Sequence, residues 1–468
     1  MRKEIMEYDL DWTLGSMMNN AAKLSNSTDK ELAYLLKYMP TFSELPALFS
    51  AFGDAGTAFF EMAGTYMNNI LTAKERGKKT AITTFCLSPA ILYAMDVVPI
   101  TLELLTVMGT VMWKRGTADY LDFCIEAGFT ETSCSSQRGS LGAYLAGLGV
   151  DIDFVVNDSP GVCDTNANAF AFAAAYLDKP FFQLNMPSDL TSKRATDYHR
   201  KDFKAMIDFI EDQTGTKLNQ DKLREILEEV KIQEELIGEI EELQMLTPNP
   251  SPVEFSFLVY STRFLFSGSK EGTKGLRVLL EQIRENAAKG ISGLAGGVEK
   301  SRALFCYIDH YTTDMRFWKM LNKNGVTHLG NILGRSWYEE SPLPQYKGDR
   351  DESFSIDTSD MEAMIDTMGA INARMPMIKS IRGPYDDPHM WLDDNLALAK
   401  MYNVDFIVYS GTPGCRNTWG MVKLFARDTE KHGYPTHLMY SDAFDDRVES
   451  WETTQSRFEE FLQVRRLV

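Results

Sequence analysis

The chain has 468 residues, a length that predicts two or three domains rather than a single core. Its formal net charge of −18 argues against nucleic acid as the main partner, because phosphate backbones are bound by basic surfaces. Neither an apolar run of about 18 residues nor the apolar core of a signal peptide occurs. We therefore expect a cytoplasmic protein that is not bound to a membrane.

The N-terminal part is predicted to be a helical extension, residues 1–77. Apolar residues at helical spacing run from Phe42 to Tyr66, and a basic break follows at Lys74 to Lys79. This extension precedes the part of the chain in which strand patterns begin.

Residues 78–205 alternate short apolar runs with helical stretches, which is typical of a parallel α/β layer. The predicted strands are 80–85, 153–156 and 180–185, and the clearest helices are 137–148 and 166–177. We assign this segment as a first α/β lobe.

Residues 206–300 are mainly helical and charged, with an amphipathic stretch at 221–246 and a break at Thr247–Pro252, and they are predicted to connect two lobes. The α/β pattern resumes over 301–468. The predicted fold class is α/β, with two Rossmann-like or flavodoxin-like parallel-sheet lobes, a helical segment joining them and the N-terminal helical extension. The predicted elements of the second lobe are strands 303–308, 404–409 and 435–440 and helices 315–324, 419–432 and 447–464.

Three of the six cysteines lie where the chain is expected to enter a helix. These are Cys86, Cys134 and Cys415. The N-terminus of a helix offers free N–H groups and the positive end of its dipole, and both favour a thiolate. There is no C-x-x-C pair, so a metal site would have to be assembled from distant segments. The pattern predicts a metal or redox site at these three cysteines.

The other cysteines give weaker signals. Cys163 lies just past a predicted strand, and the sequence leaves open whether it is a ligand, a polar neighbour or a packing residue. Cys124 and Cys306 lie in apolar helical and strand contexts, which favours core packing.

Four segments of the chain, taken in order, carry a resemblance. They are Phe85–Cys86 with the residues up to Glu103, Cys134 with Arg138, the stretch 153–187 around Cys163, and the Cys415 loop with the C-terminal residues up to Phe461. Together they resemble the 2-hydroxyacyl-CoA dehydratase and benzoyl-CoA reductase subunit family, which includes component D of 2-hydroxyglutaryl-CoA dehydratase. The resemblance covers most of residues 78 to 468, whereas the preceding residues do not match. The loop before Cys415 also departs from the commoner family pattern, so substrate identity stays open.

The resemblance implies a 4Fe–4S cluster held by Cys86, Cys134 and Cys415, with one iron lacking a cysteine ligand. It also implies a related second subunit, a separate ATP-hydrolysing activator that supplies an electron, an acyl-CoA substrate and an anaerobic metabolism. In the dehydratases, which are lyases, the electron makes a thioester ketyl radical that expels the 2-hydroxyl group. In benzoyl-CoA reductases, which are oxidoreductases, electrons enter an aromatic ring. Both activities stay open, as do an electron-relay subunit and a cluster-free binding protein.

Two further residues are candidates for a catalytic role. Arg138, one helical turn after Cys134, is placed to donate to cluster sulfur or to the thioester, with an ion pair as the alternative. His310, just after a predicted strand, is placed to move a proton near neutral pH, with a structural role as the alternative. Ser88 and Ser135 are candidates either for hydrogen bonds to the cluster or for helix caps. No Walker A sequence occurs, so ATP hydrolysis by this chain is not expected.

Overall fold

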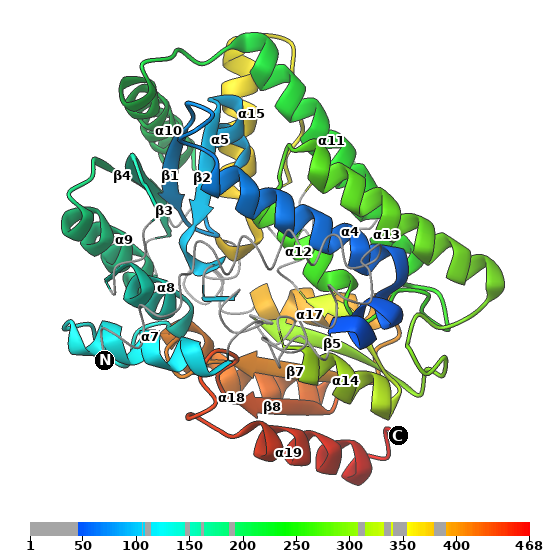
Figure 1. Ribbon diagram of the computed structural model, residues 1–468. Coiled ribbons are helices and arrows are strands. Elements are labelled where there is room, and N and C mark those ends of the chain that lie inside the picture. The colour runs from blue at the N-terminus through cyan, green and yellow to red at the C-terminus, as the bar shows by residue number, and fades with distance from the viewer. Residues whose placement is uncertain are drawn as a thin grey trace, which may run out of the picture.

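Two four-stranded parallel sheets lie among helices, which confirms the predicted α/β class with two parallel-sheet lobes (Figure 1). Among the residues described, no helix combines the length and the apolar character needed to cross a membrane. The computed structural model describes residues 45–104, 106–107, 114–145, 150–160, 163–186, 192–307, 314–331, 338–339, 353–378 and 390–468.

The first sheet has the strand order β2-β1-β3-β4, and all of its neighbouring strands are parallel. Its strands read as short apolar runs because helices cover both faces of a parallel sheet. The predicted strands at 80–85, 153–156 and 180–185 correspond to β1, β3 and β4. The strands are β1 (Lys79–Thr83), β2 (Val97–Thr101), β3 (Phe154–Pro160) and β4 (Phe181–Met186), and the helices of this lobe are α5 (Ala90–Ala94), α7 (Lys114–Glu126), α8 (Ser135–Leu145) and α9 (Asp164–Leu177).

The second sheet repeats this order as β6-β5-β7-β8, again with parallel neighbours. In each sheet the order reverses at the first strand, so the loops after β1 and β3, and after β5 and β7, flank a topological switch point where α/β proteins bind ligands. The strands are β5 (Ser301–Tyr307), β6 (Val326–Asn331), β7 (Phe406–Gly411) and β8 (Thr436–Tyr440), and the helices are α14 (Met315–Asn324), α17 (Met390–Met401), α18 (Arg416–Lys431) and α19 (Trp451–Val464).

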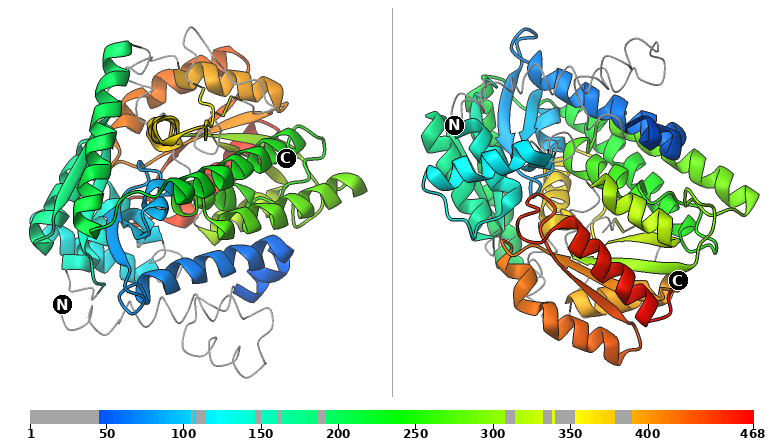
Figure 2. Two further views of the ribbon diagram at one scale, coloured as in Figure 1. Left: turned by 90° about the horizontal axis from the view of Figure 1, so that it is seen from above. Right: turned by 60° about the horizontal axis from the view of Figure 1, so that its bottom comes forward.

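Helices α18 and α19 both pack on the second sheet at β8, as the right-hand view of Figure 2 shows. The closing helix was predicted from residue 447, but α19 begins at Trp451. The reason is local: Ser450 is extended, and its side chain accepts the Thr453 N–H as an N-cap.

Four helices fill the connecting region, and the N-terminal helix α4 (Leu45–Leu71) packs along one of them, α13 (Figure 1). Helix α11 buries most of its apolar residues along one face, as the amphipathic pattern at 221–246 predicted. Helix α15 (Met361–Ala373), from the second half of the chain, packs on α10 and α11. Its Asn372 bonds Ser88 and Asp158, so α15 also reaches the first lobe. The connecting helices are α10 (Lys193–Thr214), α11 (Gln220–Leu243), α12 (Phe255–Leu265) and α13 (Lys270–Lys289).

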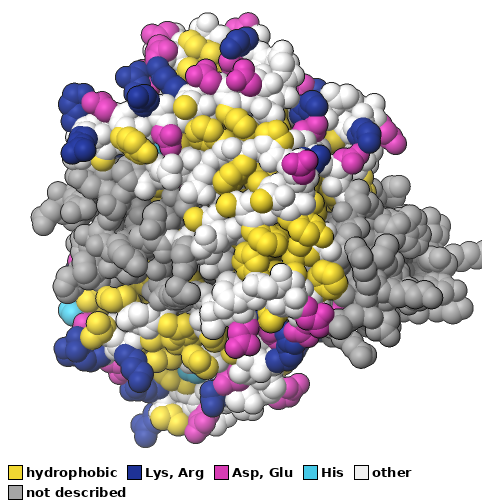
Figure 3. Space-filling model, turned by 90° about the vertical axis from the view of Figure 1, so that its left-hand side faces the viewer, with side chains coloured by type: hydrophobic (Ala, Val, Ile, Leu, Met, Phe, Trp, Pro, Cys, Tyr) yellow, Lys and Arg dark blue, Asp and Glu magenta, His cyan; other side chains and the backbone are white. Residues whose placement is uncertain are grey.

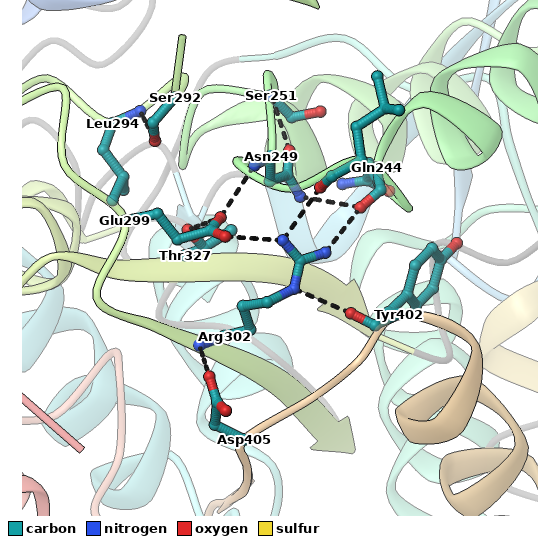
Figure 4. Close-up of polar contacts among 11 residues, drawn as sticks. Gln244, Asn249, Ser251, Ser292, Leu294, Glu299, Arg302, Thr327, Tyr402 and Asp405 are labelled. Carbon is teal, nitrogen blue, oxygen red and sulfur yellow. Dashed lines mark hydrogen bonds and ion pairs between the residues drawn. The ribbon is translucent and has the colours of Figure 1, made fainter. Parts of the chain in front are cut away.

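A buried arginine joins the connecting region to the second sheet (Figure 4). The Arg302 guanidinium, on β5, donates to the Glu299 carboxylate at 2.8 Å and to the carbonyls of Gln244 and Leu246 at 3.0 and 3.1 Å. Its Nε donates to the Tyr402 carbonyl at 2.9 Å. The side chains of Arg302 and Glu299 are only 6% and 7% exposed, so these bonds are made away from water. One side chain therefore fixes the end of α11, the start of β5 and the end of α17.

Replacing this arginine is expected to destabilise the protein strongly. Arg302→Met removes the cation that pairs with the buried Glu299 carboxylate and the donor to three backbone carbonyls, and breaking such a buried pair costs about 3–5 kcal/mol. Urea unfolding followed by circular dichroism measures the change. Arg284→Met is the matched control, because its pair with Glu239 is 50% and 38% exposed and such pairs contribute about 1 kcal/mol or less. Equal midpoints for the two variants would contradict the structural role of Arg302.

Candidate functional site

Three cysteines occupy the same position relative to a helix. Cys163 is the N-cap of α9 and Cys415 the N-cap of α18, and Cys134 directly precedes α8. The carbonyl of each accepts the N–H of the residue four positions on, at 3.0–3.3 Å. The sulfurs of Cys163 and Cys415 make no capping bond to their own helices. All three side chains are half-buried. Each thiol therefore stands at the positive end of a helix.

The cysteine-bearing segments of the two lobes touch. A Cβ added to Gly414 would lie 2.6 Å from the Ser133 carbonyl oxygen and 3.2 Å from Cys134 Cα, so the loop leading to Cys415 packs on the backbone leading to Cys134. Burial raises the pKa of the Cys134 thiol, and the nearby thiols of Cys415 and Cys163 raise it further. The structure thus brings two of the three predicted cysteines together and adds Cys163 to them.

Cys86 has a different setting. It is 2% exposed, and the Asn166 side-chain amide donates to its sulfur at 3.2 Å. The following helix α5 begins only at Ala90, with Pro89 as its N-cap, so Cys86 does not stand at a helix end. Burial raises the pKa of the Cys86 thiol well above its usual value, and the Cys163 thiol and the carboxyls of Asp158 and Glu103 raise it further. Cys86 is more deeply buried than Cys134, Cys163 and Cys415.

Two buried carboxyl groups beside Cys86 were not singled out from the sequence. Glu103 follows β2, and its Oε1 accepts from the Thr84 hydroxyl at 2.8 Å and from the Gln137 amide at 3.2 Å. Asp158, in β3, accepts from the Asn372 amide at 2.5 Å. Burial raises the pKa of both carboxyls, which favours their neutral forms. The signal that could have identified them is an acidic residue at the end of an apolar strand.

A third buried carboxyl group, Asp442, contacts both cysteine-bearing segments. Its Oδ1 accepts from the Ser135 hydroxyl and from the Phe444 N–H, both at 2.9 Å, and its Oδ2 accepts from the Thr412 hydroxyl. Ser135 is the residue after Cys134, and Thr412 lies between β7 and Cys415. Burial raises the pKa of the Asp442 carboxyl. The Ser135 hydroxyl thus bonds an aspartate across the lobes rather than capping its own helix.

The remaining predicted site residues are placed as follows. Arg138 is only 6% exposed, and its Nε donates to the Ser133 carbonyl at 3.0 Å, so it holds the loop before Cys134. The Ser88 hydroxyl is buried without a hydrogen-bond partner in the described part of the chain. His310 follows β5 in sequence and lies outside the described residues. The two cysteines predicted to pack in the core, Cys124 and Cys306, are both 0% exposed.

The thiols do not form a site for a single ion. Within the described ranges, no three His, Cys, Asp or Glu side chains are arranged around one metal ion. One ion draws thiolates to about 2.3 Å, whereas an iron–sulfur cluster spreads its cysteine ligands over separate irons. The three half-buried thiols belong to the described residues, and the buried hydroxyls of Ser88 and Ser136 lack hydrogen-bond partners there. Sulfur ligands of this kind are the ones that an iron–sulfur cluster would need.

These features define a two-lobed α/β protein in which a cysteine-bearing loop of one lobe packs against a cysteine-bearing loop of the other. The family model described as 2-hydroxyglutaryl-CoA dehydratase, D-component, matches residues 86–464, and the chain belongs to this family. A curated relative, the (R)-2-hydroxyisocaproyl-CoA dehydratase alpha subunit of Clostridioides difficile, is 25% identical over 246 residues. The match covers 49% of this chain and 59% of the relative's length. The family resemblance found in the sequence is confirmed, and helix α4 lies before the matched residues.

The contact between the lobes predicts that alanine substitution at two glycines changes the stability of the protein in opposite directions. Gly414→Ala would force the Ser133 carbonyl away, so we expect a loss of about 1–3 kcal/mol from overpacking. Gly420, in α18, has nothing within 4 Å of an added Cβ, so Gly420→Ala should stabilise by about 0.5–1 kcal/mol. Thermal unfolding of both variants measures this. A Gly414→Ala protein as stable as Gly420→Ala would show that the two loops do not pack together.

Proposed function

We propose that this chain is a subunit of a 2-hydroxyacyl-CoA dehydratase and holds a 4Fe–4S cluster. The observation that carries the proposal is the set of three half-buried thiols at the N-termini of α8, α9 and α18, drawn from both lobes. Membership in the dehydratase D-component family supports the same activity.

Among the cysteines, we propose Cys134, Cys163 and Cys415 as the cluster ligands. The sequence placed Cys86 in this set, and three observations favour Cys163 over it. Cys163 stands at a helix N-terminus as the other two do, it is partly exposed, and its charge acts on Cys134. Cys163 and Cys415 also hold equivalent places, because each follows the third strand of its lobe and begins the next helix. The buried Cys86, bonded by Asn166, suits a supporting position behind them.

A bound cluster would supply one-electron transfer and an iron open to a substrate oxygen. The chain's own residues prepare the site for it. Three helix N-termini direct positive dipole ends at the thiols, and burial disfavours a thiolate that no cation compensates. Iron would provide that compensation. The neutral forms favoured for Glu103 and Asp158 keep two negative charges away from Cys86, the thiol behind the proposed ligands.

We also propose that the chain acts with partners: a related second subunit, a separate ATP-hydrolysing activator and an acyl-CoA substrate. The relative's description as an alpha subunit supports an assembly of several subunits. Tyr176 on α9 and Tyr198 on α10 are 51% and 52% exposed. On the face shown in Figure 3, apolar side chains gather between charged ones of both signs. Exposed apolar area of this kind suits a surface that another subunit covers.

The ligand set is tested by iron content. Anaerobically purified Cys134→Ser, Cys163→Ser and Cys415→Ser variants should each lose most of their iron and acid-labile sulfide, because each removes a thiolate ligand. Cys124→Ser, in the buried face of α7, is the matched control and should retain both. Circular dichroism checks that the fold persists. If Cys86→Ser loses iron while Cys163→Ser keeps it, then Cys86 is the third ligand instead.

The activity is tested on the assembled enzyme. The chain, co-purified with its partner subunit and supplied with activator, ATP and a one-electron reductant, should convert a 2-hydroxyacyl-CoA into the 2-enoyl-CoA with loss of water. Chromatography with mass detection measures the product. Reduction of benzoyl-CoA in its place would assign the reductase activity. Full dehydration by an assembly in which this chain has lost its cluster ligands would contradict a catalytic role for its cluster.

A further inference from the structure

We propose that Asp442 is a positioning residue that fixes the separation of Cys134 and Cys415 across the two lobes. Its significance for a cluster rests on the proposed function, but the geometry itself concerns two thiols of the chain and is testable without iron. None of the sequence patterns that pointed to the cysteines assigned Asp442 a role.

The contacts of Asp442 make it a bridge between the two cysteine-bearing segments. It follows β8 in the second lobe and is 4% exposed. One carboxyl oxygen accepts from Ser135, the first residue of α8, and the other accepts from Thr412, three residues before Cys415. A bond to the Phe444 N–H holds the carboxyl itself in place. Both partners thus lie within three residues of a thiol.

The other contacts between these segments do not set the separation in the same way. The contact of Gly414 with Ser133 and Cys134 is packing, which prevents closer approach but does not prevent the segments from moving apart. Arg447 binds the Asp122 carboxylate on α7 at 2.7 and 2.9 Å, but the two side chains are 49% and 46% exposed. Exposed pairs of this kind hold their geometry weakly. Of these three contacts between described residues, the buried bridge through Asp442 is the one able to resist separation.

The bridge requires a planar side chain with two polar atoms, one for each hydroxyl partner. Both partners are hydroxyls, which can donate or accept. An asparagine at this position would keep a bond to each, since its oxygen accepts from Ser135 and its amide donates to Thr412. An alanine would lose both bonds. A role in positioning therefore predicts rescue by asparagine, whereas a role that needs the negative charge does not.

The test is thiol cross-linking of the full chain in its iron-free, reduced form. A short bis-maleimide is added, and the linked peptides are identified by mass spectrometry. The wild-type protein should give a Cys134–Cys415 link. Asp442→Ala should lower its yield several-fold, while Asp442→Asn should keep it near the wild-type yield. The Cys134–Cys163 link, within the first lobe, is the internal standard and should not change.

Two controls separate positioning from general loss of stability. Arg447→Gln removes the exposed bridge from the same segment and should leave the Cys134–Cys415 link intact. Asp314→Ala removes a 2%-exposed aspartate that caps α14 in the second lobe, and it should lower the melting temperature without changing the link. If Asp442→Ala does not fold, Ser135→Ala and Thr412→Val each remove one of its two bonds, and each should lower the link yield partially.

The outcomes distinguish this proposal from the proposed function. An unchanged Cys134–Cys415 yield in Asp442→Ala, or in both single-bond variants, overturns the positioning role whatever the iron content. Loss of the link in Asp442→Asn as well as in Asp442→Ala overturns it in favour of a role for the charge. A lowered yield in Asp442→Ala with rescue in Asp442→Asn supports it. Should the wild-type protein bind no iron, the proposed function fails while the positioning result stands.

Discussion

The site depends on thiols that lie at helix N-termini in a buried environment. The helix N-termini favour the thiolate form, whereas burial disfavours it. Parallel sheets place the ends of their strands, and the starts of the following helices, on one edge. Two such sheets meet here with Cys163 and Cys415 at equivalent helix starts and Cys134 at a third. The dipoles favour thiolates, yet burial raises the pKa of Cys134. The positive charge of the proposed cluster would relieve that opposition.

Such a site requires the two lobes to keep a fixed position relative to one another. Buried polar side chains stabilise this arrangement at three places. Arg302 anchors the second sheet to the connecting helices. Asn372, on α15, accepts from the Ser88 N–H and donates to Asp158, so a helix from late in the chain braces the loop after β1. Asp442 bridges the segments of Cys134 and Cys415. Removing one partner of any of these contacts destabilises the protein, because the remaining buried polar group keeps its desolvation penalty without a hydrogen bond.

The candidate site was only partly accessible to sequence reasoning. Cys134 and Cys415 were predicted because a cysteine beside a helix start is a local pattern. Cys163 shows the same pattern, but nothing local reveals that it lies close enough to Cys134 to raise the pKa of that thiol. Cys86 was predicted because a helix was expected directly after it, whereas α5 begins only at Ala90. Arg138 was expected near the thiols, but its bond to the Ser133 carbonyl depends on how the loop folds back.

The sequence by itself determined the alternation of strands and helices and the two-lobed α/β class, because short apolar runs and helical spacing are properties of neighbouring residues. It also carried the family resemblance, which the ordered segments around the cysteines gave and the family model confirms. Only the tertiary structure decided which cysteines meet, that α15 returns to the first lobe, and that Glu103, Asp158 and Asp442 are buried. These facts depend on contacts between different elements, and two of them join residues 214 and 307 positions apart, Asn372 with Asp158 and Asp442 with Ser135. Such contacts arise from the packing of whole elements, which leaves no local pattern in the chain.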